Sequence, residues 1–163
     1  MPAQKVENTS VSGDESRPRI TLWHASLILV VIGLLISGYL SYVKLADIEV
    51  LCTEDGSFRC DVVQNSTYAE MFGIPVAYLG FLSYVVIGLL LVLQERIAFL
   101  QENGIILTFG VVFVAFLFSM YLVYIQGVVL DAWCPWCLTH EVNITVLFAV
   151  TGWRLRQFLA TNW

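Results

Sequence analysis

The feature that most limits how this chain can fold is a series of long apolar stretches almost free of charge. They cover residues 20–42, 74–93, 104–130 and 134–153. A helix needs roughly 20 apolar residues to cross the hydrocarbon core of a bilayer. Because a backbone in lipid must satisfy its hydrogen bonds internally, such stretches form helices. The sequence therefore predicts an all-α integral membrane protein, built as a bundle of four transmembrane helices.

The composition supports a membrane protein and argues against other classes. Of the 163 residues, 58% are hydrophobic and 13% are charged, whereas about a quarter of the residues in a soluble domain are charged. Mean hydropathy is +0.78. The net charge of −5, with no cluster of Lys or Arg, argues against a nucleic-acid partner. We expect residues 1–19, which are polar and Ser-rich, to form a disordered cytoplasmic tail, and residues 157–163 to form a second cytoplasmic tail.

The basic residues predict how the four spans are oriented. Lys and Arg in short loops are retained on the cytoplasmic side of a membrane. With the N-terminus inside, the inner side would hold six of them and the outer side two, Lys44 and Arg59. We therefore expect both termini in the cytoplasm and residues 43–73 on the outer face of the cytoplasmic (inner) membrane. The six inner residues are Lys5, Arg17, Arg19, Arg96, Arg154 and Arg156.

The four cysteines, Cys52, Cys60, Cys134 and Cys137, all fall in or next to the two predicted outer loops. That side of the membrane is where disulfides form and persist. Four cysteines allow three pairings. Cys52 with Cys60 and Cys134 with Cys137 are the local ones, and exchange between the pairs is possible because both loops emerge on one face.

This layout suits a relay in which a thiolate attacks a disulfide and the mixed disulfide passes electrons to the next pair. Cys134-Pro135-Trp136-Cys137 opens the fourth span, and Pro135 suits the first turn of a helix. The positive end of the helix dipole can then stabilise a thiolate. A quinone, which is a two-electron acceptor that lives in the bilayer, is the natural sink for electrons arriving there.

Other interpretations of these residues stay open. Cys52 and Cys60 can form an inert staple. A zinc site of four cysteines is disfavoured because seven residues separate Cys52 from Cys60, outside the usual spacing; we expect no metal. His140 and Glu141, three and four residues after Cys137, either supply protons for quinone reduction or lie solvated in the interfacial region.

Three motifs point to a known family. They are C-D-V-V-Q-N-S at 60–66, G-I-P-V-A-Y-L-G at 73–80 and C-P-W-C at 134–137. The first lies in the outer loop that follows span one, the second leads into span two, and the third opens the last span. The chain resembles the vitamin K epoxide reductase family, in its prokaryotic disulfide-generating branch, from residue 20 to 156. The resemblance implies a four-helix bundle around a quinone, ubiquinone or menaquinone, with loop 43–73 folded over it as a lid that includes a short helix.

The resemblance also implies roles for single residues. Cys137 would lie next to the quinone, Cys134 would take electrons from Cys60, and Cys52 would exchange with the partner. Ser66 matches a serine that the family places near the active site. The implied partner is a thioredoxin-like (DsbA-like) protein outside the cytoplasm, and we expect it to be a separate chain.

The expected activity is thus a membrane thiol oxidase that generates disulfides and reduces quinone. Two alternatives remain at this stage. The first is a reductase of vitamin K epoxide or quinone. It is weakened because this chain lacks an obvious match to the asparagine and tyrosine that contact the quinone or vitamin K in the animal members. Their positions fall near Val76 and Glu141. The second is a four-span protein without enzymatic activity, stabilised by structural disulfides.

Overall fold

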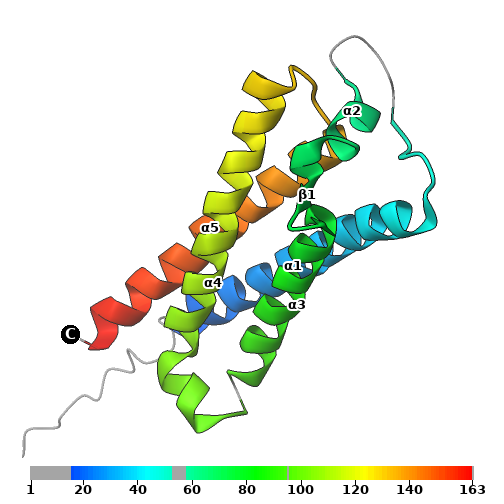
Figure 1. Cartoon of the computed structure of the whole chain (residues 1–163). Coiled ribbons are helices and arrows are strands. Elements are labelled where there is room, and N and C mark those ends of the chain that lie inside the picture. The colour runs from blue at the N-terminus through cyan, green and yellow to red at the C-terminus, as the bar shows by residue number, and fades with distance from the viewer. Residues whose placement is uncertain (1–15, 53–57, 95, 163) are drawn as a thin grey trace, which may run out of the picture.

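A computed structural model describes residues 16–52, 58–94 and 96–162. Long helices that lie side by side make up most of this part of the chain (Figure 1). The connection between the first two lies at one end of the bundle, near the turn that joins the last two, and the C-terminus lies at the opposite end. The long helices are α1 (Ser16–Ala46), α3 (Val76–Leu93), α4 (Ala98–Tyr124) and α5 (Pro135–Asn162).

The α1–α3 connection, residues 47–75, contains the predicted short helix, α2 (Cys60–Gln64). A 3-10 helix (Thr67–Ala69) follows, and then an antiparallel hairpin of β1 (Glu70–Met71) and β2 (Ile74–Pro75). Phe72 and Gly73 turn this hairpin with φ values of +55° and +78°. The left-handed region favours glycine, which has no Cβ to clash there. The part of the connection from residue 58 to residue 75 is therefore a folded element rather than a free loop.

The structure corrects several predicted boundaries. Residues 1–15 of the expected tail lie outside the described residues, but residues 16–19 belong to α1 and are not disordered. Residues 74–75 form β2 rather than the start of a span, since α3 begins after Pro75. α4 begins at residue 98, not 104, and α5 runs through the expected tail to residue 162. Hydropathy predicts where a helix is apolar, whereas its ends are set by local hydrogen bonds.

Three helical segments in the described part of the chain are long and apolar enough to cross a membrane: Thr21–Ala46, Val76–Leu93 and Ala98–Val129. These segments expose large apolar side chains, for example Leu35 at 69% and Val114 at 66%. In water such surfaces would be unfavourable. The chain is therefore a helical membrane protein. The fourth long helix, α5, carries polar residues towards both of its ends, and the count of four spans remains a prediction.

Tyr84 on α3 joins three of the helices. Its side chain is 1% exposed and packs in the central core with Val30 of α1 and Ile144 of α5. The Asn143 side-chain amide of α5 donates hydrogen bonds to the Tyr84 hydroxyl (2.9 Å) and to the Leu29 carbonyl of α1 (3.0 Å). These polar groups satisfy one another where no water is available. They therefore fix the relative positions of α1, α3 and α5.

Gly33 of α1 lies against the ring of Tyr84, so closely that a Cβ at this position would overlap the ring atoms. Small residues of this kind let helix backbones approach one another in membranes. Gly38, one turn further along α1, is different, because a Cβ there would lie 3.5 Å from Phe81, an ordinary contact.

We predict that Gly33→Ala destabilises the protein by about 1–3 kcal/mol, the usual cost of overpacking. Tyr84 cannot move away without losing its bond to Asn143. Gly38→Ala is the matched control, since both glycines are within the same helix and share the gain in helix propensity. Thermal unfolding in detergent measures the difference. Equal midpoints for the two variants would contradict the predicted overlap.

Candidate functional site

All four cysteines meet in one cluster at the end of the bundle. Cys52 and Cys60 form a disulfide, whereas Cys134 and Cys137 are free thiols. Cys60 is the first residue of α2 and is 1% exposed; Cys134 directly precedes α5 and is 0% exposed. Cys137 lies in the first turn of α5. The four pack with apolar residues that include Val63. Segments about 75 residues apart in sequence are thus brought together.

Main-chain hydrogen bonds dock the α1–α3 connection onto the turn between α4 and α5. The Arg59 N–H donates to the Trp133 carbonyl at 3.1 Å, and Phe58 pairs with Trp133 as a single parallel β-bridge. The Arg59 guanidinium donates to the Asp131 carbonyl, also at 3.1 Å. Because Arg59 precedes Cys60, these bonds set the position of the Cys60 sulfur.

A second group of contacts holds the segment before Cys52. The Trp136 indole N–H donates to the Leu51 carbonyl at 2.8 Å. The Leu51 N–H donates to the Tyr39 hydroxyl at 3.3 Å, and the rings of Tyr39 and Trp136 are 4.8 Å apart. Trp136 is one of the two residues between the free cysteines, so the same side chain touches both halves of the site. Cys52 is partly exposed, and it is therefore accessible from outside the cluster.

The turn between α4 and α5 holds Cys134. α4 continues into a π-helical turn, Ile125–Val129. Gln126 in this turn is 3% exposed, and its side-chain oxygen accepts a hydrogen bond from the Cys134 N–H at 3.3 Å. Its carbonyl accepts another from the Ala132 N–H at 3.1 Å. π-helical turns are often found at functional sites. Gln126 thus fixes the backbone on the N-terminal side of the free thiol pair.

Cys134 lies outside the helical segments, in front of Pro135. The pKa of its thiol falls from the ordinary 9.0 to about 7, chiefly because the Cys137 thiol hydrogen-bonds to it. Burial opposes the shift, while the N–H groups of Cys137 and Trp136 and the Gln64 side chain add to the lowering. The Cys137 N–H lies 3.4 Å from the Cys134 sulfur. These donors favour a thiolate at Cys134 near neutral pH.

The short helix α2 also touches the second thiol. The Gln64 side-chain amide donates to the Cys137 sulfur at 3.6 Å. The Gln64 carbonyl accepts a hydrogen bond from Lys44 at the end of α1 (3.4 Å), and Lys44 also pairs with Glu70 of β1 at 3.7 Å. Lys44 is thereby a clamp between α1 and the connection. It keeps Gln64 over the thiol pair.

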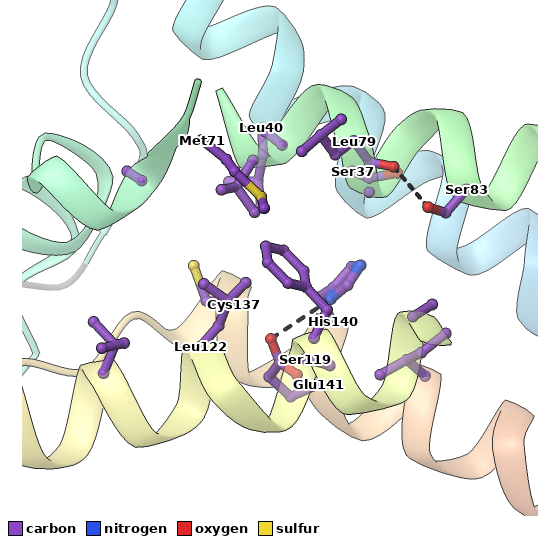
Figure 2. A pocket seen from close by; sticks show the side chains of 18 of the residues that line it. Ser37, Leu40, Met71, Leu79, Ser83, Ser119, Leu122, Cys137, His140 and Glu141 are labelled. Carbon is purple, nitrogen blue, oxygen red and sulfur yellow. Dashed lines mark hydrogen bonds and ion pairs between the residues drawn. The ribbon is translucent and has the colours of Figure 1, made fainter. Parts of the chain in front are cut away.

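A cavity of about 560 Å³ opens next to Cys137 and extends between the helices. Its volume lies within the range of small-molecule sites. Figure 2 shows two facing walls, one of α1, β1 and α3 and the other of α4 and α5. The first carries Ser37, Leu40, Met71, Leu79 and Ser83. The second carries Ser119, Leu122, Cys137, His140 and Glu141. Most of the lining is apolar, so the cavity suits an apolar ligand with few polar atoms.

The three additional residues predicted at the site, Ser66, His140 and Glu141, all line this cavity. The Ser66 hydroxyl donates to the Val63 carbonyl at 2.9 Å, which closes the C-terminal end of α2. His140 Nδ1 lies 3.8 Å from Glu141 Oε1. Glu141 is 5% exposed. The alternative in which both residues are solvated at the interface therefore does not describe Glu141, because the helices enclose its side chain.

Sequence reasoning missed three side chains that complete the site: Gln64, Gln126 and Ser119. The sequence indicates two of them, since Gln126 and Ser119 are polar residues inside a stretch without charge. Polar residues in such stretches often face the protein interior. Within the described residues, no group of three or more His, Cys, Asp or Glu side chains could hold a metal ion.

Comparisons with known proteins agree with the geometry. Residues 24–152 match the vitamin K epoxide reductase family. The chain is also similar to the thiol-disulfide oxidoreductase LTO1 of Arabidopsis thaliana, with 34% identity over 117 residues. That match covers 69% of this chain and 31% of the relative, so the chain spans about a third of the relative's length. Paired cysteines in one cluster and a relative named for thiol-disulfide chemistry support a redox function, and the chain belongs to the vitamin K epoxide reductase family.

Proposed function

We propose that the protein is a membrane thiol oxidase that generates disulfides. In this proposal Cys52 and Cys60 take electrons from a thioredoxin-like protein, Cys134 and Cys137 receive them, and a quinone removes them. The observation that carries the proposal is the joint burial of Cys60 and Cys134 in one cluster, with Cys137 on the wall of the cavity.

The exchange between the pairs is balanced by the cysteines alone. A reduced Cys60 thiolate attacks the Cys134 sulfur of a Cys134–Cys137 disulfide, and Cys137 leaves as a thiolate. The Cys52 thiolate then attacks Cys60, which closes the Cys52–Cys60 disulfide and releases Cys134. Two electrons have moved from one pair to the other. The disulfide at Cys52–Cys60 beside free Cys134 and Cys137 corresponds to the product of this step.

The environment of each cysteine supports its part in the relay. Cys52 is partly exposed and suits exchange with a protein partner, whereas Cys60 and Cys134 are shielded from other thiols. A low thiol pKa makes a good leaving group, and the pKa of Cys134 is lowered to about 7 by hydrogen bonds, first of all from Cys137. Cys134 is therefore released readily from the mixed disulfide with Cys60.

The cavity fits a quinone on two counts. Its walls are mainly apolar, and two of the residues that line it, Glu141 and Ser119, each have a buried oxygen (Oε2 and Oγ) without a hydrogen-bond partner. A bound quinone would accept two electrons and two protons at the Cys137 end of this cavity. Cys137 presents its sulfur to the cavity, and the Gln64 side-chain amide donates to that sulfur. Ubiquinone and menaquinone are the candidates.

The membrane arrangement belongs to the same proposal. We place the cysteine cluster on the outer face of the cytoplasmic membrane and both termini inside, because most Lys and Arg residues then lie inside. α5 would be the fourth span. Its exposed apolar side chains, such as Val142 at 64% and Val146 at 42%, support contact with lipid. The thioredoxin-like partner would then meet Cys52 outside the cytoplasm, where disulfides persist.

Anaerobic mixing of the fully reduced protein with ubiquinone-1 or menadione tests the proposal. We predict that the quinone is converted to quinol while disulfides form at both cysteine pairs. Absorbance follows the quinone, and thiol counting follows the cysteines. Cys137→Ser is the matched control and reduces no quinone with any reductant. Turnover retained in Cys137→Ser would remove Cys137 from its assigned position, and unreacted quinone with the wild type would contradict the oxidase function.

A second prediction concerns the relay. Cys52→Ala or Cys60→Ala abolishes oxidation of a reduced thioredoxin-like protein of the DsbA type, because the protein substrate cannot reach the buried Cys134. Oxidation of dithiothreitol continues in both variants, since a small dithiol can reach Cys137 through the cavity. Rates with the two reductants are compared in the same detergent preparation. Equal loss of both rates would show that Cys52 and Cys60 act only as a staple.

A further inference from the structure

Two residues that line the cavity, Ser119 and Glu141, each have a buried side-chain oxygen without a hydrogen-bond partner. In the described residues six buried side-chain nitrogen or oxygen atoms are without a partner, and only these two belong to residues of the cavity wall. Ser119 is 2% exposed and Glu141 is 5% exposed. A buried polar group without a partner is costly, and native proteins keep few of them. These two atoms therefore point to a ligand that would satisfy them.

The other serine hydroxyls that line the cavity are already hydrogen-bonded. Ser37 donates to the Gly33 carbonyl at 2.6 Å, and Ser83 donates to the Leu79 carbonyl at 2.8 Å. Both are the usual bonds of a serine to the preceding helical turn. Ser119 is also in a helix, α4, but does not make this bond. Its hydroxyl remains free to bind within the cavity, as does Glu141 Oε2.

The two atoms belong to the same wall as Cys137 (Figure 2). Cys137, His140 and Glu141 have i, i+3 and i+4 spacing on α5, which puts them on one face of the helix. Ser119 joins them from α4. A flat ring that meets the Cys137 sulfur at one point can therefore present an oxygen to Ser119 and Glu141 at another.

We propose that Glu141 is a catalytic acid that protonates one quinone oxygen, and that the Ser119 hydroxyl hydrogen-bonds to this same oxygen. The proposal rests on the quinone-reducing function and deepens it, because it names the protein groups that recognise and protonate the acceptor. The carboxyl is suited to be neutral and to donate, since a charged carboxylate with an unpartnered, buried oxygen is strongly disfavoured.

The step balances in electrons and protons. Counted from the two neutral thiols, Cys134 and Cys137 lose two protons and two electrons as the S–S bond forms between them; where Cys134 is already a thiolate, its proton has passed to water beforehand. Conversion of quinone to hydroquinone consumes two electrons and one proton at each oxygen. Glu141 supplies the proton at one oxygen and regains one of the two released by the thiols. The second released proton passes to water, and the second oxygen takes one from water, so the net change in protons is zero.

The titratable side chains that share the cavity with Glu141 come from α5, α3 and the α1–α3 connection. The titratable side chains lining the cavity besides Glu141 are Cys137 and His140 on α5, Tyr84 on α3 and Tyr68 in the α1–α3 connection. The Tyr84 hydroxyl is already hydrogen-bonded to Asn143. α1 and α4 contribute only hydroxyls as polar groups along their long helices, namely Ser37 and Ser119. Among the described residues that line the cavity, Glu141 is thus the only carboxylic acid.

We predict that Glu141→Gln lowers kcat for reduction of ubiquinone-1 by about 10²-fold or more, the range of general-acid catalysis, with little change in KM. Glutamine keeps the shape and a hydrogen-bond donor but cannot give up a proton. Ser119→Ala instead raises KM several-fold, up to about tenfold, as expected for one lost hydrogen bond. The controls are Glu102→Gln, an exposed carboxylate on α4, and Ser26→Ala, a buried serine bonded to the Leu22 carbonyl.

A measurement without turnover tests the same groups. In a Cys134→Ala background, infrared difference spectra are recorded on addition of ubiquinone-1. We expect a band of a protonated carboxylic acid that shifts to lower frequency on binding and is absent when Glu141→Gln is added. If the protein that retains Glu141 shows no shift of an acid band on binding, the proposal is overturned. This spectrum also decides the matter if Glu141→Gln does not fold.

The possible results distinguish a failure of this inference from a failure of the proposed oxidase function. If the wild type reduces quinone and Glu141→Gln does so at the same kcat, the catalytic acid is wrong and the oxidase function stands. If the wild type reduces no quinone, the oxidase function fails, and the role of Glu141 fails with it. A shifted acid band together with a low kcat in Glu141→Gln supports both.

Discussion

The hydrogen bond between the Arg59 N–H and the Trp133 carbonyl joins the two parts of the chain that carry the cysteine pairs. Thiol–disulfide exchange requires direct contact between sulfur atoms, so two pairs on separate loops are useless to one another unless the loops are docked. Arg59 lies one residue before Cys60, and Trp133 lies one residue before Cys134. The cavity has one of its walls built on the docked segment, and it therefore depends on the same bond.

The cysteines and the long helices could be predicted from the sequence because each depends on a short stretch of chain. Apolar runs without charge must be helical in lipid, and the positions of Cys134 and Cys137 before and inside the last helix follow from Pro135 between them. The short helix α2 came from the family resemblance, and the structure contains it. The long helices and the cysteine motif are local properties that a single sequence is enough to identify, whereas α2 required the resemblance to a family.

The remaining features could not be predicted because they depend on contacts between distant residues. The polar character of Gln126 and Ser119 indicates that they face the interior, but it does not indicate that Gln126 accepts a hydrogen bond from the Cys134 N–H or that the Ser119 hydroxyl lacks the usual bond to its own helix. The hairpin at residues 70–75 is likewise too short to be specified by its own sequence. Helix ends were also missed, since α4 starts at Ala98, ahead of the polar residues Gln101, Glu102 and Asn103 after which the predicted span began.

The π-helical turn at Ile125–Val129 changes the helical phase at the end of α4. In that turn the Leu130 N–H reaches back five residues to the Ile125 carbonyl, instead of the four of an α-helix. One residue more or less rotates everything beyond it by about 100°. The wide turn therefore changes the direction in which the chain leaves α4 from Leu130 onward. The side of α4 that faces lipid and the segment that leads to Cys134 thus do not share one helical phase.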